Sequence, residues 1–122
     1  MTNLQINEYQ ERAHEFAFYT SPVVITSKGG HIALPFTYAV QGLAEESGEV
    51  CGKFAKILRD KNGIVSPEDV TAISKELGDV LWMVSEICTN LGIDLESVMA
   101  GNLQKLTDRA NRGMLSGSGD NR

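Results

Sequence analysis

Residues 42–50, "GLAEESGEV", lie within a segment whose apolar residues recur every three or four positions. This spacing is typical of one face of an amphipathic helix, and it predicts that the segment is helical. The apolar face consists of Phe36, Val40, Leu43, Val50 and Ile57. At the border of this face the chain places three carboxylates, Glu45, Glu46 and Glu49. Because burying an unpaired carboxylate is costly, we expect the helix to face something other than an apolar core here.

The same periodicity, followed outward from this segment, predicts an all-α fold: a four-helix bundle formed by one domain of residues 1–115. The expected helices cover about residues 4–18, 36–59, 67–91 and 95–111. Ser66 and Asp94 are good N-cap residues for the third and fourth helices, and Pro67 suits a first helical position. Gly63, in "DKNG", suits a left-handed turn that ends the second helix.

Two segments lack a helical pattern. Residues 20–35 are expected to form an irregular arm or a small hairpin, because β-branched residues precede a Gly-Gly pair in "VVITSKGGHIAL". Residues 116–122, which include "GSGDNR", are expected to form a Gly/Ser-rich tail.

The third and fourth helices are expected to turn apolar faces toward the core. On the third helix this face consists of Val70, Ile73, Leu77, Val80, Leu81, Val84, Ile87, Cys88 and Leu91. On the fourth it consists of Val98, Met99, Leu103, Leu106 and Ala110.

Composition narrows the class of protein. The 122 residues are 42% hydrophobic and 22% charged, as in ordinary globular domains, and the longest apolar run is too short to cross a membrane. A net charge of −5 argues against nucleic-acid binding, because no basic surplus is present to neutralise phosphates. The first residues lack the pattern of a secretory signal, and the two cysteines are too few for a disulfide framework, so we expect a cytoplasmic protein.

A second pair of carboxylates, Glu76 and Asp79, borders the apolar face of the third helix. If the second and third helices pack antiparallel, their carboxylates can converge, and lysines or metal ions would have to compensate the repulsion. Oxygen ligands of this kind, without His or Cys, suit Mg²⁺, Mn²⁺ or Ca²⁺. The alternative is two solvated helix faces without a common role. A di-iron site would need two Glu-x-x-His pairs, and the sequence offers only Glu11 with His14.

Cationic and aromatic residues near these carboxylates suggest a phosphorylated ligand. Lys53 and Lys56 follow Glu49 on the same helix. The fourth helix carries a polar face of Asn102, Lys105 and Arg109. Such residues can hold phosphates, although each taken singly could be a solvated charge. Trp82 follows Asp79 by three residues and could stack on a base or be buried in the core. Other candidates for base binding are Phe18, Tyr19, His31 and Tyr38.

The acidic motifs "EESGE" at 45–49 and "ELGD" at 76–79 resemble those of the MazG-like all-α nucleoside triphosphate pyrophosphohydrolases. The flanking "EVCGKFAKILRD", "KELGDVLW" and "NLQKLTDR" extend the similarity, and "YQERA" and "GSGDNR" are similar to small stand-alone members. The resemblance implies Mg²⁺-dependent cleavage of a nucleoside triphosphate to the monophosphate and pyrophosphate. It also implies assembly as a homodimer or homotetramer.

The resemblance also implies roles for individual residues. Metal ligands would be Glu46, Glu49, Glu76 and Asp79, and phosphates would be held by Lys53, Lys56, Asn102, Lys105 and Arg109. Glu45 and Glu46 are the catalytic candidates, although many relatives have glycine at the position of Glu45. Candidates for the base are Trp82, His31 and Tyr38. Two alternatives stay open: a same-fold hydrolase with another substrate, dUTPase-like or phosphoribosyl-ATP-cleaving, and a noncatalytic module that binds a nucleotide or a partner.

Overall fold

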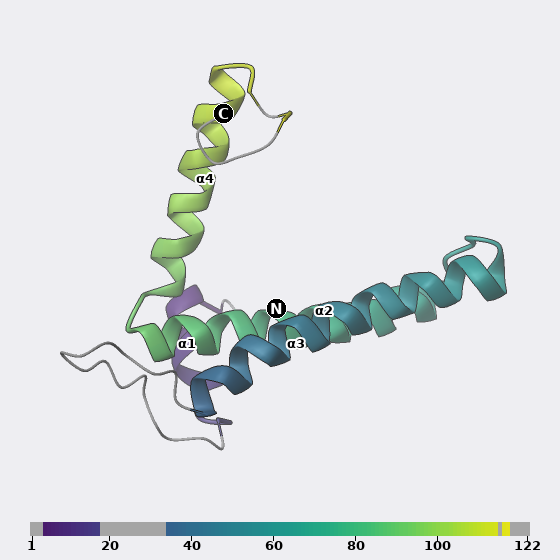
Figure 1. Ribbon diagram of the computed structural model, residues 1–122, viewed down its shortest axis with the longest axis horizontal. Coiled ribbons are helices and arrows are strands. Elements are labelled where there is room, and N and C mark those ends of the chain that lie inside the picture. The colour runs from purple at the N-terminus through teal and green to yellow at the C-terminus, as the bar shows by residue number, and fades with distance from the viewer. Residues whose placement is uncertain (1–3, 18–33, 115, 118–122) are drawn as a thin grey trace.

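The structure, a computed structural model, describes residues 4–17, 34–114 and 116–117, without the side chains of 34–37. Its helices are α1 (Ile6–His14), α2 (Leu34–Lys61), α3 (Pro67–Leu91) and α4 (Leu95–Asn111) (Figure 1). The described residues contain no strand, which confirms the all-α prediction. Most of the predicted arm at 20–35 lies outside the described residues, although its last two positions belong to α2. Most of the 116–122 tail also lies outside them.

Helices α2 and α3 form a long antiparallel pair joined by a short turn (Figure 1). The turn contains two successive left-handed residues, Asn62 with φ of 53° and Gly63 with φ of 79°. Ser66 then caps α3: its hydroxyl accepts a hydrogen bond from the backbone N–H of Asp69, and its own N–H donates to the Asp69 carboxylate. This capping box confirms the predicted start of α3.

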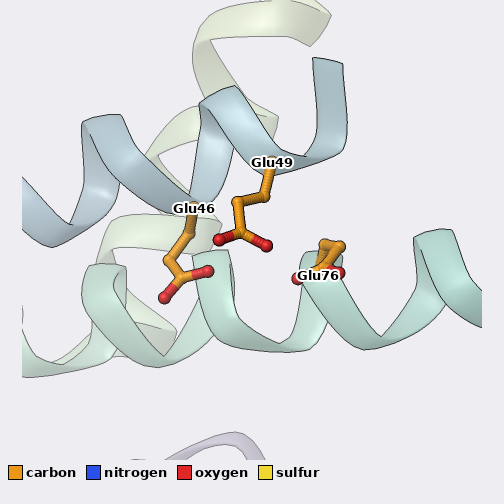
Figure 2. Close-up of side chains that lie close together, drawn as sticks. All are labelled: Glu46, Glu49 and Glu76. Atoms are coloured by element: carbon orange, nitrogen blue, oxygen red, sulfur yellow. The ribbon is translucent and has the colours of Figure 1, made fainter. Parts of the chain in front are cut away.

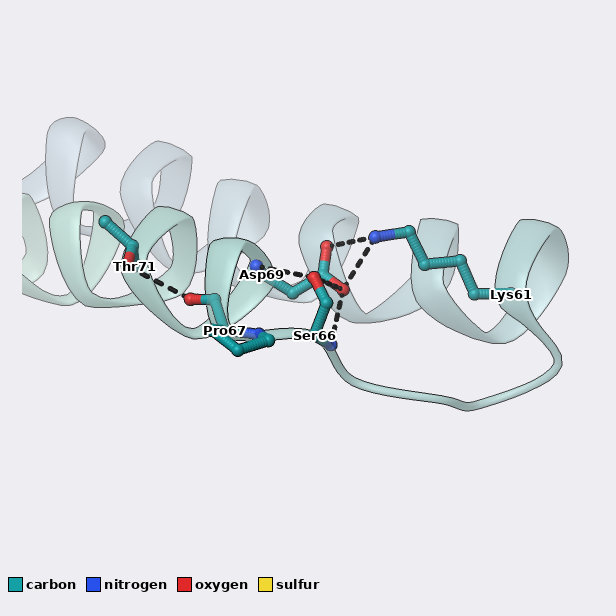
Figure 3. Close-up of polar contacts among 5 residues, drawn as sticks. All are labelled: Lys61, Ser66, Pro67, Asp69 and Thr71. Atoms are coloured by element: carbon teal, nitrogen blue, oxygen red, sulfur yellow. Dashed lines mark hydrogen bonds and ion pairs between the residues drawn. The ribbon is translucent and has the colours of Figure 1, made fainter.

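A lysine from the end of α2 reaches the same cap. Lys61 Nζ lies 2.7 Å from both carboxylate oxygens of Asp69 (Figure 3). The Lys61 ammonium, followed by the backbone N–H of Ser66, lowers the pKa of Asp69 to about 2. The turn therefore fixes how the chain passes from α2 to α3. The negative charge of Asp69 is compensated there by Lys61 and by the backbone N–H of Ser66.

Close packing between α2 and α3 depends on a glycine one turn before the acidic motif. A Cβ placed on Gly42 would lie 2.6 Å from Met83 Sδ and 2.7 Å from Met83 Cε. Gly42 thus leaves room for the buried Met83 side chain of α3. Because this contact is close, the acidic residues that follow on α2 are brought toward those of α3.

Helix α1 packs on α3 and on the start of α4, largely through polar contacts. Gln10 donates to the carbonyl of Ile93 at 2.9 Å and accepts from the N–H of Leu95 at 2.8 Å, so it bridges the α3–α4 junction. Trp82 Nε1 donates to the carbonyl of Ala13 at 3.1 Å. Ala13 is the residue of α1 that is buried. These directed hydrogen bonds therefore fix the position of α1 against α3 and the start of α4.

Helix α4 leads away from the α2–α3 pair, and among the described residues it contacts α1 and α3 but not α2 (Figure 1). Its predicted core face is exposed within one chain, with Leu103 66% exposed. On α3 the structure buries Ile73, Met83 and Cys88, whereas several residues of the predicted core face are exposed: Val70, Leu77, Leu81 and Leu91. Periodicity identified these apolar faces, but the single chain does not cover them.

None of the helices within the described ranges has the length and apolarity that crossing a bilayer requires.

Candidate functional site

Three of the predicted metal ligands meet between α2 and α3. Glu46, Glu49 and Glu76 each offer a carboxylate oxygen within 4.8 Å of the others. Figure 2 shows Glu46 and Glu49 on successive turns of α2, with side chains directed toward Glu76 on α3. The antiparallel pairing expected from the sequence produces this convergence. We call these three residues the acidic cluster.

The acidic cluster is electrostatically unfavourable without a cation. Burial raises the pKa of Glu46, and the neighbouring carboxylate of Asp79 raises it further, followed by those of Glu49, Glu45 and Glu76. Both effects disfavour the ionised form of Glu46. A divalent ion would reverse them, because it stabilises the ionised carboxylates that bind it. The donor set, consisting of carboxylate oxygens alone, fits Mg²⁺ or Mn²⁺.

The two remaining predicted acids lie at the edge of the acidic cluster. Asp79 is exposed and near enough to Glu46 to be the strongest of the charges that raise its pKa. Glu45 is also exposed and contributes to the same shift.

The predicted phosphate-binding lysines of α2 have acidic neighbours. Lys53 Nζ lies 3.0 Å from Glu76 Oε1, and the Glu76 side chain is 13% exposed. Lys53 therefore compensates the negative charge of Glu76, which is what we expect if lysines offset part of the repulsion between the carboxylates. Lys56 lies nearer the turn and lines a small pocket that also includes Lys61 and Asp69.

Within one chain, the predicted phosphate-binding residues of α4 are separated from the acidic cluster. Asn102 and Lys105 are exposed, and Arg109 is buried near the end of the helix. Because α4 makes no contact with α2 among the described residues, these side chains are not brought to Glu46 and Glu49.

An aromatic pocket of about 510 Å³ lies next to Asp79, between α1 and α3. Its lining consists of Leu4, Tyr9, Arg12, Ala13, Phe16, Gly78, Asp79 and Trp82. Burial raises the pKa of Tyr9, and the carboxylates of Asp79 and Glu86 add to this shift. Among the described residues, Trp82 is the base-binding candidate that lines this pocket. Phe18 and Tyr19 lie outside the described residues. Tyr38 is not part of the lining, and His31 lies outside the described residues.

Sequence reasoning missed a polar contact between two side chains that joins α1 to α3. Glu86 is fully buried, and its Oε2 lies 3.1 Å from Nδ1 of His14, which is half-exposed. From the sequence alone, His14 is only half of an incomplete di-iron motif. A carboxylate inside the apolar run "VSEIC", residues 84–88, is the signal that could have drawn attention to this pair.

Comparison with known proteins identifies the family of the chain. Residues 36–114 match the model of the MazG nucleotide pyrophosphohydrolase domain. The chain is 38% identical over 119 residues to the Gene 37 protein of Mycobacterium phage L5, an alignment that covers 98% of this chain and all of the phage protein. No solved structure matches the chain.

Proposed function

Since the chain belongs to the MazG nucleotide pyrophosphohydrolase family, we propose that it hydrolyses nucleoside triphosphates to monophosphates and pyrophosphate in a Mg²⁺-dependent reaction. The observation that carries this proposal is the convergence of Glu46, Glu49 and Glu76 from two helices onto one point. Repelling carboxylates in this arrangement have no stabilising role in a simple helical scaffold. This favours an enzyme over a noncatalytic binding module.

In this proposal the acidic cluster and Asp79 hold the metal, with Mn²⁺ as a possible substitute for Mg²⁺. A bound divalent ion neutralises triphosphate charge and lowers the pKa of a coordinated water. Glu45 is exposed beside Glu46 and is available to accept a proton from the attacking water. The water oxygen then bonds to the α-phosphorus as the bond from that phosphorus to the α–β bridging oxygen breaks. Lys53, whose Nζ lies 3.0 Å from Glu76 Oε1, would be the cation that stabilises the departing pyrophosphate.

The experiment is a panel of canonical and damaged ribo- and deoxyribonucleoside triphosphates, assayed for pyrophosphate and monophosphate with Mg²⁺ and with EDTA. We expect Mg²⁺-dependent release of both products in equal amounts from at least one nucleotide. A selective response to dUTP or phosphoribosyl-ATP would place the chain with the other hydrolases of this fold. No hydrolysis of any nucleotide would contradict the proposal.

We further propose that a second copy of the chain covers α4 and completes the phosphate site. The apolar face of α4 is exposed, and it includes Val98, Met99, Leu103 and Leu106. A contiguous exposed apolar face of this kind marks an interaction surface. Lys105 lies on the same helix and would bring positive charge toward the acidic cluster of the other copy.

Leu103→Glu tests this assembly, because Leu103 is 66% exposed and its replacement should not disturb the fold of one chain. We expect light scattering to show a dimer or tetramer for the wild type and a smaller species for the variant, with loss of most activity. The isosteric Leu103→Met is the matched control and should preserve both. A monomeric, fully active wild type would contradict the assembly.

A further inference from the structure

The aromatic pocket between α1 and α3 and the acidic cluster have Asp79 as a common neighbour. Asp79 lines the pocket, and among the neighbouring carboxylates it contributes most to the raised pKa of Glu46. Along α3, Glu76, Asp79 and Trp82 follow one another at intervals of three residues. Each of these residues therefore neighbours the next on the helix surface, while Glu76 and Trp82 lie about 120° apart around the helix axis and about 9 Å apart along it. One elongated ligand can therefore contact both regions.

The lining of the pocket is suited to a flat aromatic ligand. Three rings surround it, those of Tyr9, Phe16 and Trp82. Phe16 is 76% exposed, so its ring is available to a ligand. Arg12 lies at the same pocket with hydrogen-bond donors beyond the one that contacts Glu8 at 3.1 Å.

From this juxtaposition we infer that α1 supplies the nucleobase-recognition wall of the site: the base enters between Phe16 and Trp82 while the phosphates lie at the acidic cluster. This inference rests on the proposed function, and it names the part of the substrate that the pocket takes. The α1 wall precedes residues 36–114, the part of the chain that matches the family. One wall of the base site is thus assigned to a helix outside the matched residues, and Trp82, within them, supplies the other wall.

The contacts that hold α1 also set the shape of this pocket. Trp82 Nε1 donates to the carbonyl of Ala13, which fixes the indole at the junction of the two helices. The His14–Glu86 pair, one turn farther along α3, fixes the end of α1 from which Phe16 follows. His14 and Glu86 are therefore positioning residues for the base and do not themselves line the pocket.

Trp82 is the only tryptophan in the chain, so its fluorescence reports directly on the pocket. The probe is a set of nucleoside monophosphates, titrated in EDTA so that binding does not depend on the metal. We expect at least one of them to change Trp82 emission saturably. Ribose 5-phosphate, which lacks a base, should produce no change. Emission that no nucleotide alters would overturn the inference.

Phe16→Ala should raise the dissociation constant of the responding nucleotide about tenfold, because it removes one stacking surface. Phe16→Tyr keeps a ring and should bind like the wild type. Phe54→Ala removes a phenylalanine from an exposed site on α2 that does not line the pocket, so it should leave the constant unchanged. Equal dissociation constants for Phe16→Ala and the wild type would overturn the inference.

Hydrolysis assays separate this inference from the proposed function. In turnover, Phe16→Ala should raise the KM of the preferred nucleotide more than it lowers kcat. Nucleotide-dependent emission without hydrolysis by the wild type would preserve the pocket and reject the proposed reaction. Hydrolysis without any change in Trp82 emission would preserve the proposed reaction and reject the base pocket.

Discussion

Two regions where α2 meets α3 shift the pKa values of their carboxylates in opposite directions. At the turn, Asp69 accepts hydrogen bonds from Lys61 and Ser66, and its pKa falls to about 2. Farther along the same helices, burial and neighbouring carboxylates raise the pKa of Glu46. Because both regions belong to one pair of helices, the helices themselves do not account for the difference.

The difference lies in what compensates each charge. The turn supplies its own cation and its own backbone donor, so Asp69 contributes to the stability of the chain without any ligand. In the acidic cluster, Lys53 pairs with Glu76, while Glu46 still experiences the repulsion of several carboxylates. The turn is therefore built for stability, whereas the acidic cluster is built to receive positive charge from outside the chain. The predictions below test this division.

The largest expected effect is on activity. Glu49→Gln should reduce pyrophosphate release by more than about 100-fold, since even residues that merely support metal ligands often cost 10- to 100-fold. Helical content and the free energy of unfolding without metal should not decrease, because the substitution removes like-charge repulsion of a few tenths of a kcal/mol. Steady-state kinetics and circular dichroism provide the two measurements. An active Glu49→Gln enzyme would reject the assignment of the acidic cluster.

The turn should show the opposite pattern. Ser66→Ala removes the hydroxyl that caps α3, so the free energy of unfolding should fall by about 1 kcal/mol. The kcat and KM values measured well below the melting temperature should stay at wild-type levels. Urea unfolding and kinetics on the same preparation provide the comparison, with Thr at position 66 as the conservative control. If Ser66→Ala had the same free energy of unfolding as the wild type, the claim that the turn stabilises the chain would be wrong.

The smallest effect is on the pH dependence of stability without metal, and it has two signs. The pKa of Asp69 is lowered from 3.8 to about 2, so its stabilisation is present above pH 3.8 and is lost as the pH falls toward 2. The pKa of Glu46 is raised above 4.5, so stability should decline as the pH rises above 4.5 and Glu46 ionises. Urea unfolding across this range should show Asp69→Asn removing the first change and Glu46→Gln the second. The same pH profile in all three proteins would contradict both assignments.

Local features of the fold could be predicted from the sequence. The caps at Ser66 and Asp94 act on backbone groups within three residues, and the structure confirms them. Gly92 ends α3 in a left-handed conformation with φ of 68°, which is a local preference of glycine at this position. The convergence of Glu46 and Glu76 was also predictable, because a short turn between two long helices makes them antiparallel neighbours.

Features that depend on distant contacts could not be predicted in this way. Helical periodicity shows that the residues around Leu103 form an apolar face, but it does not show what covers that face. The Glu86–His14 pair joins residues 72 positions apart, and no spacing rule connects them. The aromatic pocket could not be predicted for the same reason, because Phe16 and Trp82 come together only when α1 packs on α3.

The account is tested most directly by a calorimetric titration of Mn²⁺ into the wild type, Glu49→Gln and Asp69→Asn without nucleotide. We predict saturable binding to the wild type and to Asp69→Asn, whose substituted carboxylate is already compensated by Lys61. Glu49→Gln should bind at least about tenfold more weakly, because it loses one anionic ligand of the acidic cluster. Equal affinity in all three proteins, or no binding to the wild type, would contradict the claim that the acidic cluster is a metal site.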